Sequence, residues 1–311
     1  MGIYLATFIL GVLLHIFIQR LFIYYKRFDD INHRSSHNTL ATRTGGIGVF
    51  VCIFIISCYQ YFIEKEIFDF SLLIPLSIMF IVGVYDDLYN ADFKLKFLLQ
   101  IVVAKLLIDQ GFVIYNFYGL FGLYEIPWLF AQLTTIFVFL VVVNAINFID
   151  GIDGLAITEL IKVLVVIEFF SDTPTPLVAL GSITIAAVVP LYYFNLRKKR
   201  KVFLGDAGSL LLGSLVMVYL LYILGPNYQI KDHYQINKVL FAVLIVIYPL
   251  MDLLRVFILR IKSGKSPFHA DKNHIHHLML NKITNNHLLI TVMIFVFEIT
   301  VFSIVYLGDL I

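Results

Sequence analysis

Charged residues are scarce in this sequence: Asp, Glu, Lys and Arg make up 14% of its 311 residues, whereas hydrophobic residues make up 60%. Average soluble domains carry about 25% charged residues, so this composition excludes an ordinary water-soluble globular protein. The formal net charge is only +2, and no excess of basic residues points to nucleic acid. The composition therefore indicates an integral membrane protein embedded in a lipid bilayer.

Cysteine is nearly absent as well. Cys52 and Cys58 lie within one apolar run, with no third thiol or neighbouring histidine, which excludes a disulfide framework and a zinc site of the usual kind. We interpret both as packing residues. The sequence also has no internal repeat, no low-complexity tract and no long polar segment, so we predict a single polytopic transmembrane domain over residues 1–311.

Apolar runs of the length of a membrane span recur along the whole chain. They predict an all-α integral membrane protein with about ten transmembrane helices. The runs cover residues 3–25, 46–63, 70–85, 95–115, 128–147, 155–170, 174–194, 205–224, 238–254 and 287–307.

Lysine and arginine divide unequally between the two sets of loops. The odd-numbered loops hold 17 of the 23 basic residues, the even-numbered loops hold three, and three lie within spans. By the positive-inside rule the odd-numbered loops are cytoplasmic, so both termini face outward. The unusual polar residues gather in these same loops, which predicts an active site on the cytoplasmic face.

Three of these loops carry the acidic residues that point to a site. Asp86 and Asp87 directly follow an apolar run, where an unpaired carboxylate costs about 2–3 kcal/mol and favours a bound cation; the alternative is a solvated helix end. In "NFIDGIDG", Asn147, Asp150 and Asp153 would share a helical face, or would form a turn that caps the next helix.

Asp206 in "FLGDAGS" begins an apolar run, either as an N-cap or within an anion-binding helix start. The preceding "RKKRK" adds positive charge there, although it also serves as a topology signal. Lys162 can neutralise Glu159 within its own helix, and Arg255 can do the same for Asp252.

The histidines of "HADKNHIHHLML" complete the polar set. His274, His276 and His277 are too closely spaced for an i, i+4 zinc pair, but imidazoles bind phosphate or transfer protons near neutral pH. The alternative is that one or two of them face solvent. Hard oxygen donors beside basic residues suit Mg²⁺, with Mn²⁺ as a substitute, and a phosphate substrate. A site at the headgroup plane implies that one substrate is a lipid.

Four motifs resemble one known family, the polyprenyl-phosphate N-acetylhexosamine-1-phosphate transferases. They are "GVYDDLYNADFKLKFLLQ", "NAINFIDGIDGLA", "FLGDAGSLLLG" and "SPFHADKNHIHHL". The "HIHH" sequence is similar to the WecA, TagO and WbpL branch more than to MraY. In the first loop, Ile31 and Arg43 stand where the family usually has proline.

The resemblance implies a role for each matching residue. Asp86 and Asp87 would lie by the lipid phosphate, with Asp86 as base or orienter, and Asp150 and Asp153 would organise nucleotide binding and catalysis. The implied magnesium ligands are Asn147 and Asp206. The implied substrate-binding residues are Lys94, Arg260, His274, His276, His277, Arg34 and His37.

The reaction that the resemblance implies is transfer of an N-acetylhexosamine 1-phosphate, usually N-acetylglucosamine 1-phosphate, from a UDP-sugar to undecaprenyl phosphate. It would start a cell-surface polysaccharide such as O-antigen in the bacterial inner membrane, and homodimerisation is expected from family similarity alone. An ion-coupled transporter and a membrane scaffold are the alternatives. Transporters place charges near the bilayer midplane and have repeated halves, which this sequence lacks.

Overall fold

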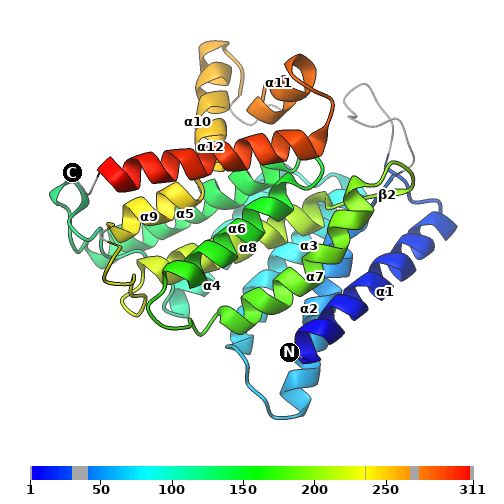
Figure 1. The fold of residues 1–311 in the computed structure, drawn as a ribbon, viewed down its shortest axis with the longest axis horizontal. Helices are drawn as coiled ribbons and strands as arrows, with labels where there is room; N and C mark the ends of the chain where they lie inside the picture. Colours follow the sequence, from blue (N-terminus) through cyan, green and yellow to red (C-terminus); the bar gives the residue numbers. More distant parts are fainter. Residues whose placement is uncertain (1, 30–40, 235, 267–272, 309–311) are drawn as a thin grey trace. The chain divides into compact units, whose positions relative to one another are not determined.

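The computed structural model describes residues 2–29, 41–234, 236–266 and 273–308, and helices make up nearly all of its regular structure (Figure 1). By their contacts the residues fall into two compact units. The first unit is Met1–Gln110 with Pro174–Leu215, and the second is Gly111–Thr173 with Val216–Ile311. Both are built from apolar helices, so this division does not test the single-domain prediction, which stays a prediction.

The elements of the first unit alternate between long helices and two short strands. They are α1 (Gly2–Tyr24), β1 (Ala41–Arg43), α2 (Gly45–Phe62), the 3-10 helix η1 (Phe70–Leu72), α3 (Leu73–Tyr89), α4 (Phe93–Asp109), α7 (Val178–Leu196) and β2 (Lys201–Phe203). The helix α8 (Gly205–Leu224) begins in the first unit and ends in the second.

The second unit is built mainly from helices, and its loops contain two isolated β-bridges, Asn116 with Glu125 and Ser171 with Ile230. Its elements are the 3-10 helix η2 (Leu120–Gly122), α5 (Trp128–Ile149), α6 (Leu155–Phe170), α9 (Lys238–Ile245), α10 (Ile247–Lys262), α11 (Ile275–Lys282) and α12 (His287–Gly308).

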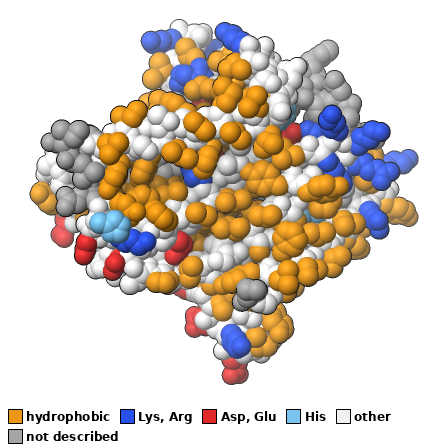
Figure 2. Space-filling view, viewed as in Figure 1, with side chains coloured by type: hydrophobic (Ala, Val, Ile, Leu, Met, Phe, Trp, Pro, Cys, Tyr) orange, Lys and Arg blue, Asp and Glu red, His pale blue; other side chains and the backbone are white. Residues whose placement is uncertain are grey.

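Every apolar run of the sequence is mostly helical, and all but the one at 238–254 lie largely within one straight helix, which confirms the all-α membrane fold. Within the described residues, seven helices are long and apolar enough to cross a membrane, or eight if the bent pair α9–α10 is one span. The helices α4 and α6 have 17 and 16 residues and are shorter than these, so the number of ten spans stays a prediction. Large apolar side chains of α1 such as Leu5 and Phe17 are exposed, and apolar side chains cover much of the face in Figure 2, as lipid contact requires.

The run at 238–254 is not the straight helix that the sequence predicts. The axes of α9 and α10 differ by 74°, and the backbone between them, at Val246, is not helical (φ −119°, ψ 29°). Pro249 explains the break, because a proline ring collides with the carbonyl four residues earlier, here that of Ile245. In the first turn of α10 the same proline is tolerated, since the N–H groups there have no partner within the helix.

Close contacts between backbones hold the first unit together. α1 packs on α2 and α7, and β1 pairs in parallel with β2, with Thr42 opposite Val202 (Figure 1). A Cβ atom on Gly46 would lie only 2.0 Å from the backbone nitrogen of Gly208. Glycine therefore lets the first turn of α2 touch that of α8. Both cysteines are free, and Cys52 is buried, in agreement with a packing role.

A buried charge group ties α6 to α12 in the second unit. Nζ of Lys162 lies 2.5 Å from Oε2 of Glu159 and 2.6 Å from Oε1 of Glu298, and the three side chains are at most 7% exposed. The other carboxylate partner, Glu298, also accepts a hydrogen bond from the backbone N–H of Tyr248, at 3.4 Å, in the first turn of α10. Lys162 thus has a second partner that its own helix does not supply.

Candidate active site

The acidic residues of the first unit meet where α3 ends and α8 begins. A Cβ atom on Gly83 would lie 2.3 Å from the carbonyl oxygen of Asp206 and 2.4 Å from Cα of Ala207, so the two helices are in backbone contact here. One turn later, α3 carries Asp86 and Asp87. The helix stops at Asn90, whose left-handed backbone (φ 52°) directs its N–H to the carbonyl of Asp86 at 2.9 Å.

Asp87 caps the N-terminus of α8. Its Oδ1 accepts the backbone N–H of Asp206 at 3.0 Å, and its Oδ2 accepts that of Ala207 at 2.9 Å. These N–H groups belong to the first turn of a helix, where a carboxylate is also favoured by the helix dipole. The idea of Asp206 as the N-cap is therefore wrong, because Asp206 is the second residue of α8 and the capping group comes from α3. The solvated helix end is wrong for Asp87, whose side chain is 5% exposed.

Lys96 of α4 joins the other two carboxylates. Its Nζ lies 3.0 Å from Oδ2 of Asp206 and also contacts Oδ2 of Asp86. The side chain of Lys94, for which the sequence predicts a phosphate contact, is exposed, and the backbone N–H of this residue donates to Oδ1 of Asp92. Lys96 is therefore the lysine of the acidic cluster, and sequence reasoning missed it.

The helical period of α4 contains a signal for Lys96. Gln100, Val103 and Leu107 are fully buried and lie four, seven and eleven residues after it, on one face of the helix. Lys94 lies outside this stripe. A lysine at the start of an otherwise buried face needs an anionic partner, and the acids of α3 and α8 supply it.

Arg43 supplies a second cation. It ends β1 and lies opposite Phe203 in the parallel pair, shortly before α8 begins. Its Nε is 2.7 Å from Oδ1 of Asp29, and its Nη1 is 3.6 Å from Oδ1 of Asp87. Burial opposes its charge, but the nearby carboxylates, led by Asp29 and Asp87, outweigh burial and raise the pKa of the guanidinium. Arg34 and His37 lie outside the described residues.

In the second unit, the segment "NFIDGIDG" is a turn and not a continuous helix. α5 ends at Ile149, Asp150 follows as its C-cap, and Gly154, with φ +83°, is the N-cap of α6. The prediction that Asn147, Asp150 and Asp153 share a helical face is therefore wrong. Asn147 lies at the end of α5, and the two acidic residues lie in the turn between α5 and α6. Glycine at position 154 accounts for this, because it readily adopts a backbone that ends a helix.

Asp153 contacts the first residue of α12. Nδ1 of His287 lies 2.9 Å from Oδ2 of Asp153 and 3.0 Å from its backbone nitrogen. His287 is the first residue of α12, and no feature of the sequence singled it out.

The histidine segment, residues 274–277, packs against the turn that contains Asp150 and Asp153. A Cβ atom on Gly151 would lie 2.6 Å from Nε2 of His276 and 2.8 Å from Nε2 of His277. His274 and His276 are buried, so the alternative in which they face solvent is wrong for these two. Burial is the main reason that the pKa of His276 lies well below its usual value, and the rings of His277 and His274 lower it further. At neutral pH this imidazole is uncharged.

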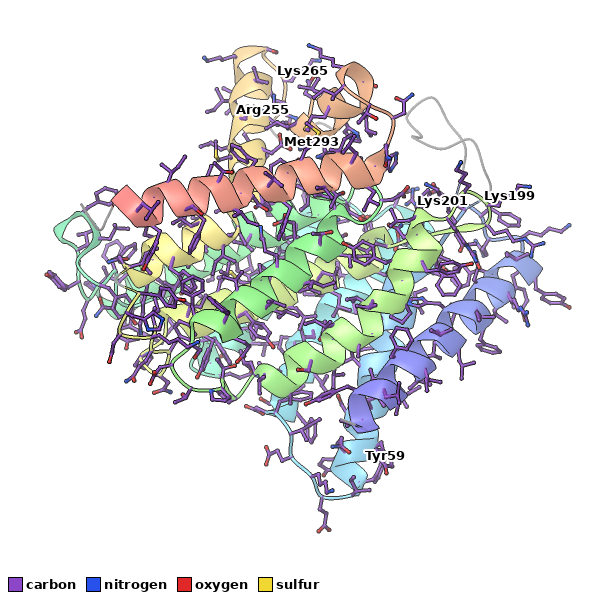
Figure 3. The ribbon with its side chains drawn as sticks, in the orientation of Figure 1. Tyr59, Lys199, Lys201, Arg255, Lys265 and Met293 are labelled. Atoms are coloured by element: carbon purple, nitrogen blue, oxygen red, sulfur yellow. The ribbon has the colours of Figure 1, made fainter. Side chains whose placement is uncertain are left out.

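Asp252 of α10 holds the histidine segment in place. Its Oδ2 lies 2.7 Å from Nδ1 of His274, while its Oδ1 accepts the backbone N–H of Ile275 and a guanidinium N–H of Arg255, both at 2.9 Å. The carboxylate is fully buried. Its neighbour Arg255, which is labelled in Figure 3, also donates a hydrogen bond to the carbonyl of Asn273. The sequence offered only the pair Asp252–Arg255, because the contact with His274 joins residues 22 apart.

Two further contacts fix the surroundings of these histidines. The hydroxyl of Tyr248, in the first turn of α10, lies 3.1 Å from Nδ1 of His276. Arg260, at the other end of α10, is 3% exposed, and its guanidinium carbon lies 6.0 Å from the ring centroid of Phe148. The broken helix thus brings a hydroxyl, a carboxylate and the guanidinium of Arg255 to residues 273–276, and it brings the guanidinium of Arg260 to α5.

The two units therefore carry different parts of the predicted site. The first brings together Asp86, Asp87 and Asp206 with Lys96 and Arg43. The second brings the acidic turn after α5 to the histidine segment. Sets of carboxylates, amides and cations of this kind, at the ends of membrane helices, suit the handling of phosphate groups and a metal ion.

Known proteins agree with this chemistry. The family described as "Glycosyl transferase family 4" matches residues 70–224. An undecaprenyl-phosphate alpha-N-acetylglucosaminyl 1-phosphate transferase of Salmonella typhi is 32% identical over 263 residues, which cover 81% of this chain and 68% of the relative. Proteins with the same name are similar in Escherichia coli K12 (31% identical over 265 residues, 81% and 68%) and in Pasteurella multocida (30% over 270 residues, 81% and 71%).

These observations define a class of protein, the membrane-bound glycosyl-1-phosphate transferases. The chain belongs to the polyprenyl-phosphate N-acetylhexosamine-1-phosphate transferase family, as its four motifs predict.

Gly205→Ala tests the capping of α8 by Asp87. Gly205 has φ +73°, and a Cβ atom there would lie 2.6 Å from Oδ2 of Asp87. We expect the substitution to lower the melting temperature and to reduce transferase turnover by at least about tenfold, since it combines about 1–2 kcal/mol of backbone strain with the loss of the cap. Gly122→Ala is the matched control, because φ there is +75° and nothing lies within 4 Å. Equal losses in both variants would show that only backbone strain matters.

Asp252→Asn tests the anchor of the histidine segment. The variant keeps the shape of the side chain but removes the charge that His274 and Arg255 contact. We expect a loss on the order of 3 kcal/mol in the free energy of unfolding, read from thermal melting in detergent, because one oxygen acceptor becomes an amide donor and the remaining hydrogen bonds of the buried group lose its charge. Asp109→Asn is the control, since Asp109 pairs with Lys105 at an exposed site. An Asp252→Asn protein as stable as this control would contradict the anchoring role.

Proposed function

We propose that this protein transfers N-acetylglucosamine 1-phosphate from UDP-N-acetylglucosamine to undecaprenyl phosphate, and so produces the lipid-linked sugar that starts a bacterial cell-surface polysaccharide. The observation that carries this proposal is the ammonium group of Lys96 between the carboxylates of Asp86 and Asp206. It marks a place for positive charge at the end of two apolar helices, where lipid headgroups lie. Family membership favours this transferase over an ion-coupled transporter.

Magnesium is the metal that we propose for the reaction. The described residues contain no group of three or more His, Cys, Asp or Glu side chains that could hold a metal. Magnesium, however, commonly binds one or two carboxylates and completes its shell with waters and substrate phosphates. Asp86 and Asp206 fit this requirement, because they already surround a cation with hard oxygen donors.

Within this proposal Asp206 is the metal ligand of the first unit, and Asn147 is a second ligand inferred from the family resemblance. Bound magnesium supplies charge neutralisation for the pyrophosphate. Mn²⁺ would serve the same purpose. Asp87 is a less suitable ligand, because both of its oxygens accept backbone N–H groups of α8.

The residues of the chain act chiefly by positioning charge. An oxygen of the lipid phosphate bonds to the sugar-linked phosphorus of the UDP-sugar, the bond from that phosphorus to the bridging oxygen breaks, and UMP leaves with the electron pair. The lipid phosphate is already ionised, so little base catalysis is needed. Lys96 and Arg43 would offset the growing negative charge, and Asp86 would orient the attacking group.

The second unit is proposed to bind the donor. Asp150 and Asp153 lie in a turn that packs on the histidine segment, and Arg260 is a buried cation near the end of α5. His277 and Arg260 would contact the phosphates of the sugar nucleotide, while His274 and neutral His276 would contribute hydrogen bonds. We further propose that both termini face outward, that the active site is cytoplasmic and that the protein forms a homodimer.

A transfer assay tests this function directly. Purified protein with undecaprenyl phosphate and radiolabelled UDP-N-acetylglucosamine should form a labelled lipid and UMP, EDTA should abolish the product, and added Mg²⁺ should restore it. A panel of other UDP-N-acetylhexosamines identifies the sugar. Absence of labelled lipid with every donor would exclude the proposed reaction.

Asp206→Ala and Asp86→Ala separate the metal ligand from the orienting residue. We expect Asp206→Ala to reduce turnover on the order of 100-fold, the equivalent of several kcal/mol of charge stabilisation, and to raise the Mg²⁺ concentration at half-maximal activity. Asp86→Ala should lose less, because an ionised phosphate needs little help from a base. Unchanged magnesium dependence and turnover in Asp206→Ala would refute its assignment as a ligand.

A further inference from the structure

An apolar groove lies along the first unit between α1 and α7, and no residue of the acidic cluster lines it. Its volume is about 740 Å³. The wall from α1 includes Phe8, Val12 and Ile16, and the wall from α7 includes Val189 and Pro190. Both helices are membrane-spanning candidates, so this groove faces a lipid environment.

The groove is long enough to hold an acyl chain. Its lining on α1 extends from Phe8 to Ile23, which corresponds to about 22 Å at a rise of 1.5 Å per residue. The hydrocarbon core of a bilayer is about 30 Å thick, so a chain of one leaflet needs about half of that depth.

One end of the groove is strongly basic. Arg20, Arg197 and Arg200 line it, and within the described part of the chain none of them forms an ion pair with a carboxylate. Arg197 directly follows α7, its guanidinium lies 4.8 Å from the ring centroid of Phe194, and its Nη2 donates to Oε1 of Gln19 at 2.5 Å. These arginines therefore stand where the apolar span ends.

The basic turn after α7 is held in a specific shape. Arg200 has a left-handed backbone (φ 51°), which costs a residue other than glycine about 1–2 kcal/mol. Nε2 of Gln19 donates to the carbonyl of Arg200 at 2.7 Å and thereby fixes this turn to α1. Burial lowers the pKa of Arg197, and the charge of Arg200 lowers it further, so an anion placed here would relieve repulsion.

We propose that this groove binds an anionic glycerophospholipid of the surrounding bilayer. Its phosphate lies against Arg20, Arg197 and Arg200, and one acyl chain follows the wall between α1 and α7. Guanidinium groups match phosphate oxygens in geometry as well as in charge, and basic pockets between membrane helices favour anionic headgroups. A free phosphate ion would use the arginines but would leave the apolar groove unfilled. Basic side chains gather near β2 in Figure 2, and Figure 3 labels Lys199 and Lys201 there.

Native mass spectrometry of the full chain, titrated with phosphatidylglycerol or phosphatidylcholine, tests the proposal. We expect wild-type protein to retain phosphatidylglycerol more tightly, and Arg20→Gln with Arg200→Asn to weaken it about 30-fold, the change expected for two surface cations. Asparagine suits the left-handed backbone at position 200. The double variant Lys198→Gln with Lys199→Gln is the matched control: it also removes two positive charges, both from the turn that carries Arg200, but neither residue lines the groove.

Ile16→Trp provides a second variant that fills the groove and leaves every arginine in place. It should also reduce phosphatidylglycerol binding while transferase activity and melting temperature are kept. The proposal would be overturned if the protein bound the two lipids with equal affinity, or if the lysine control lost as much affinity for phosphatidylglycerol as the arginine variant. It would also be overturned if a second copy of the chain covered the groove, or if undecaprenyl phosphate displaced phosphatidylglycerol. The last result would assign the groove to the acceptor lipid.

Discussion

The hydrogen bonds from the first turn of α8 to the carboxylate of Asp87 determine the arrangement of the first unit. They join the end of one membrane helix to the start of another, and they exist only because Gly83 lets the two backbones touch. Because Asp87 is held by these hydrogen bonds, Asp86 and Asp206 lie beside it. Three neighbouring carboxylates repel one another and therefore require positive charge nearby. Lys96 and Arg43 supply that charge from α4 and β1. A chemical site thus results from a helix cap.

The second unit reaches a comparable result by a different route. Its centre is the break between α9 and α10, which turns a membrane-length apolar run into a short helix and a second helix with polar residues along it. α10 carries Tyr248, Asp252 and Arg255, and each contacts the histidine segment or the residue before it. Without the break, the run would continue along the axis of α9. The polar residues of α10 therefore depend on Pro249 for their direction.

Much of the fold follows from the sequence, because apolar length and the period of a helix are local properties. The positions of the long helices, and the placement of Asp86, Asp87 and Asp206 at helix ends, could be predicted in this way. The details that failed depend on contacts between distant residues. Lys96 rather than Lys94 meets the acids because α4 turns one face inward, and Asp252 meets His274 across a stretch of chain that has no sequence period. The break at Val246 was readable from Pro249, but an uninterrupted apolar run concealed it.

The charge group of Lys162, Glu159 and Glu298 has a consequence for how the protein is made. Two of its members lie on α6, and the third lies on α12, which is synthesised well after α6. Until α12 enters the bilayer, the second carboxylate partner of Lys162 is missing, and the start of α10 lacks the acceptor that Glu298 provides for Tyr248. The second unit therefore completes its assembly only after α12 has been made, and a product that stops before α12 would carry unbalanced charge within the membrane, which quality control could recognise.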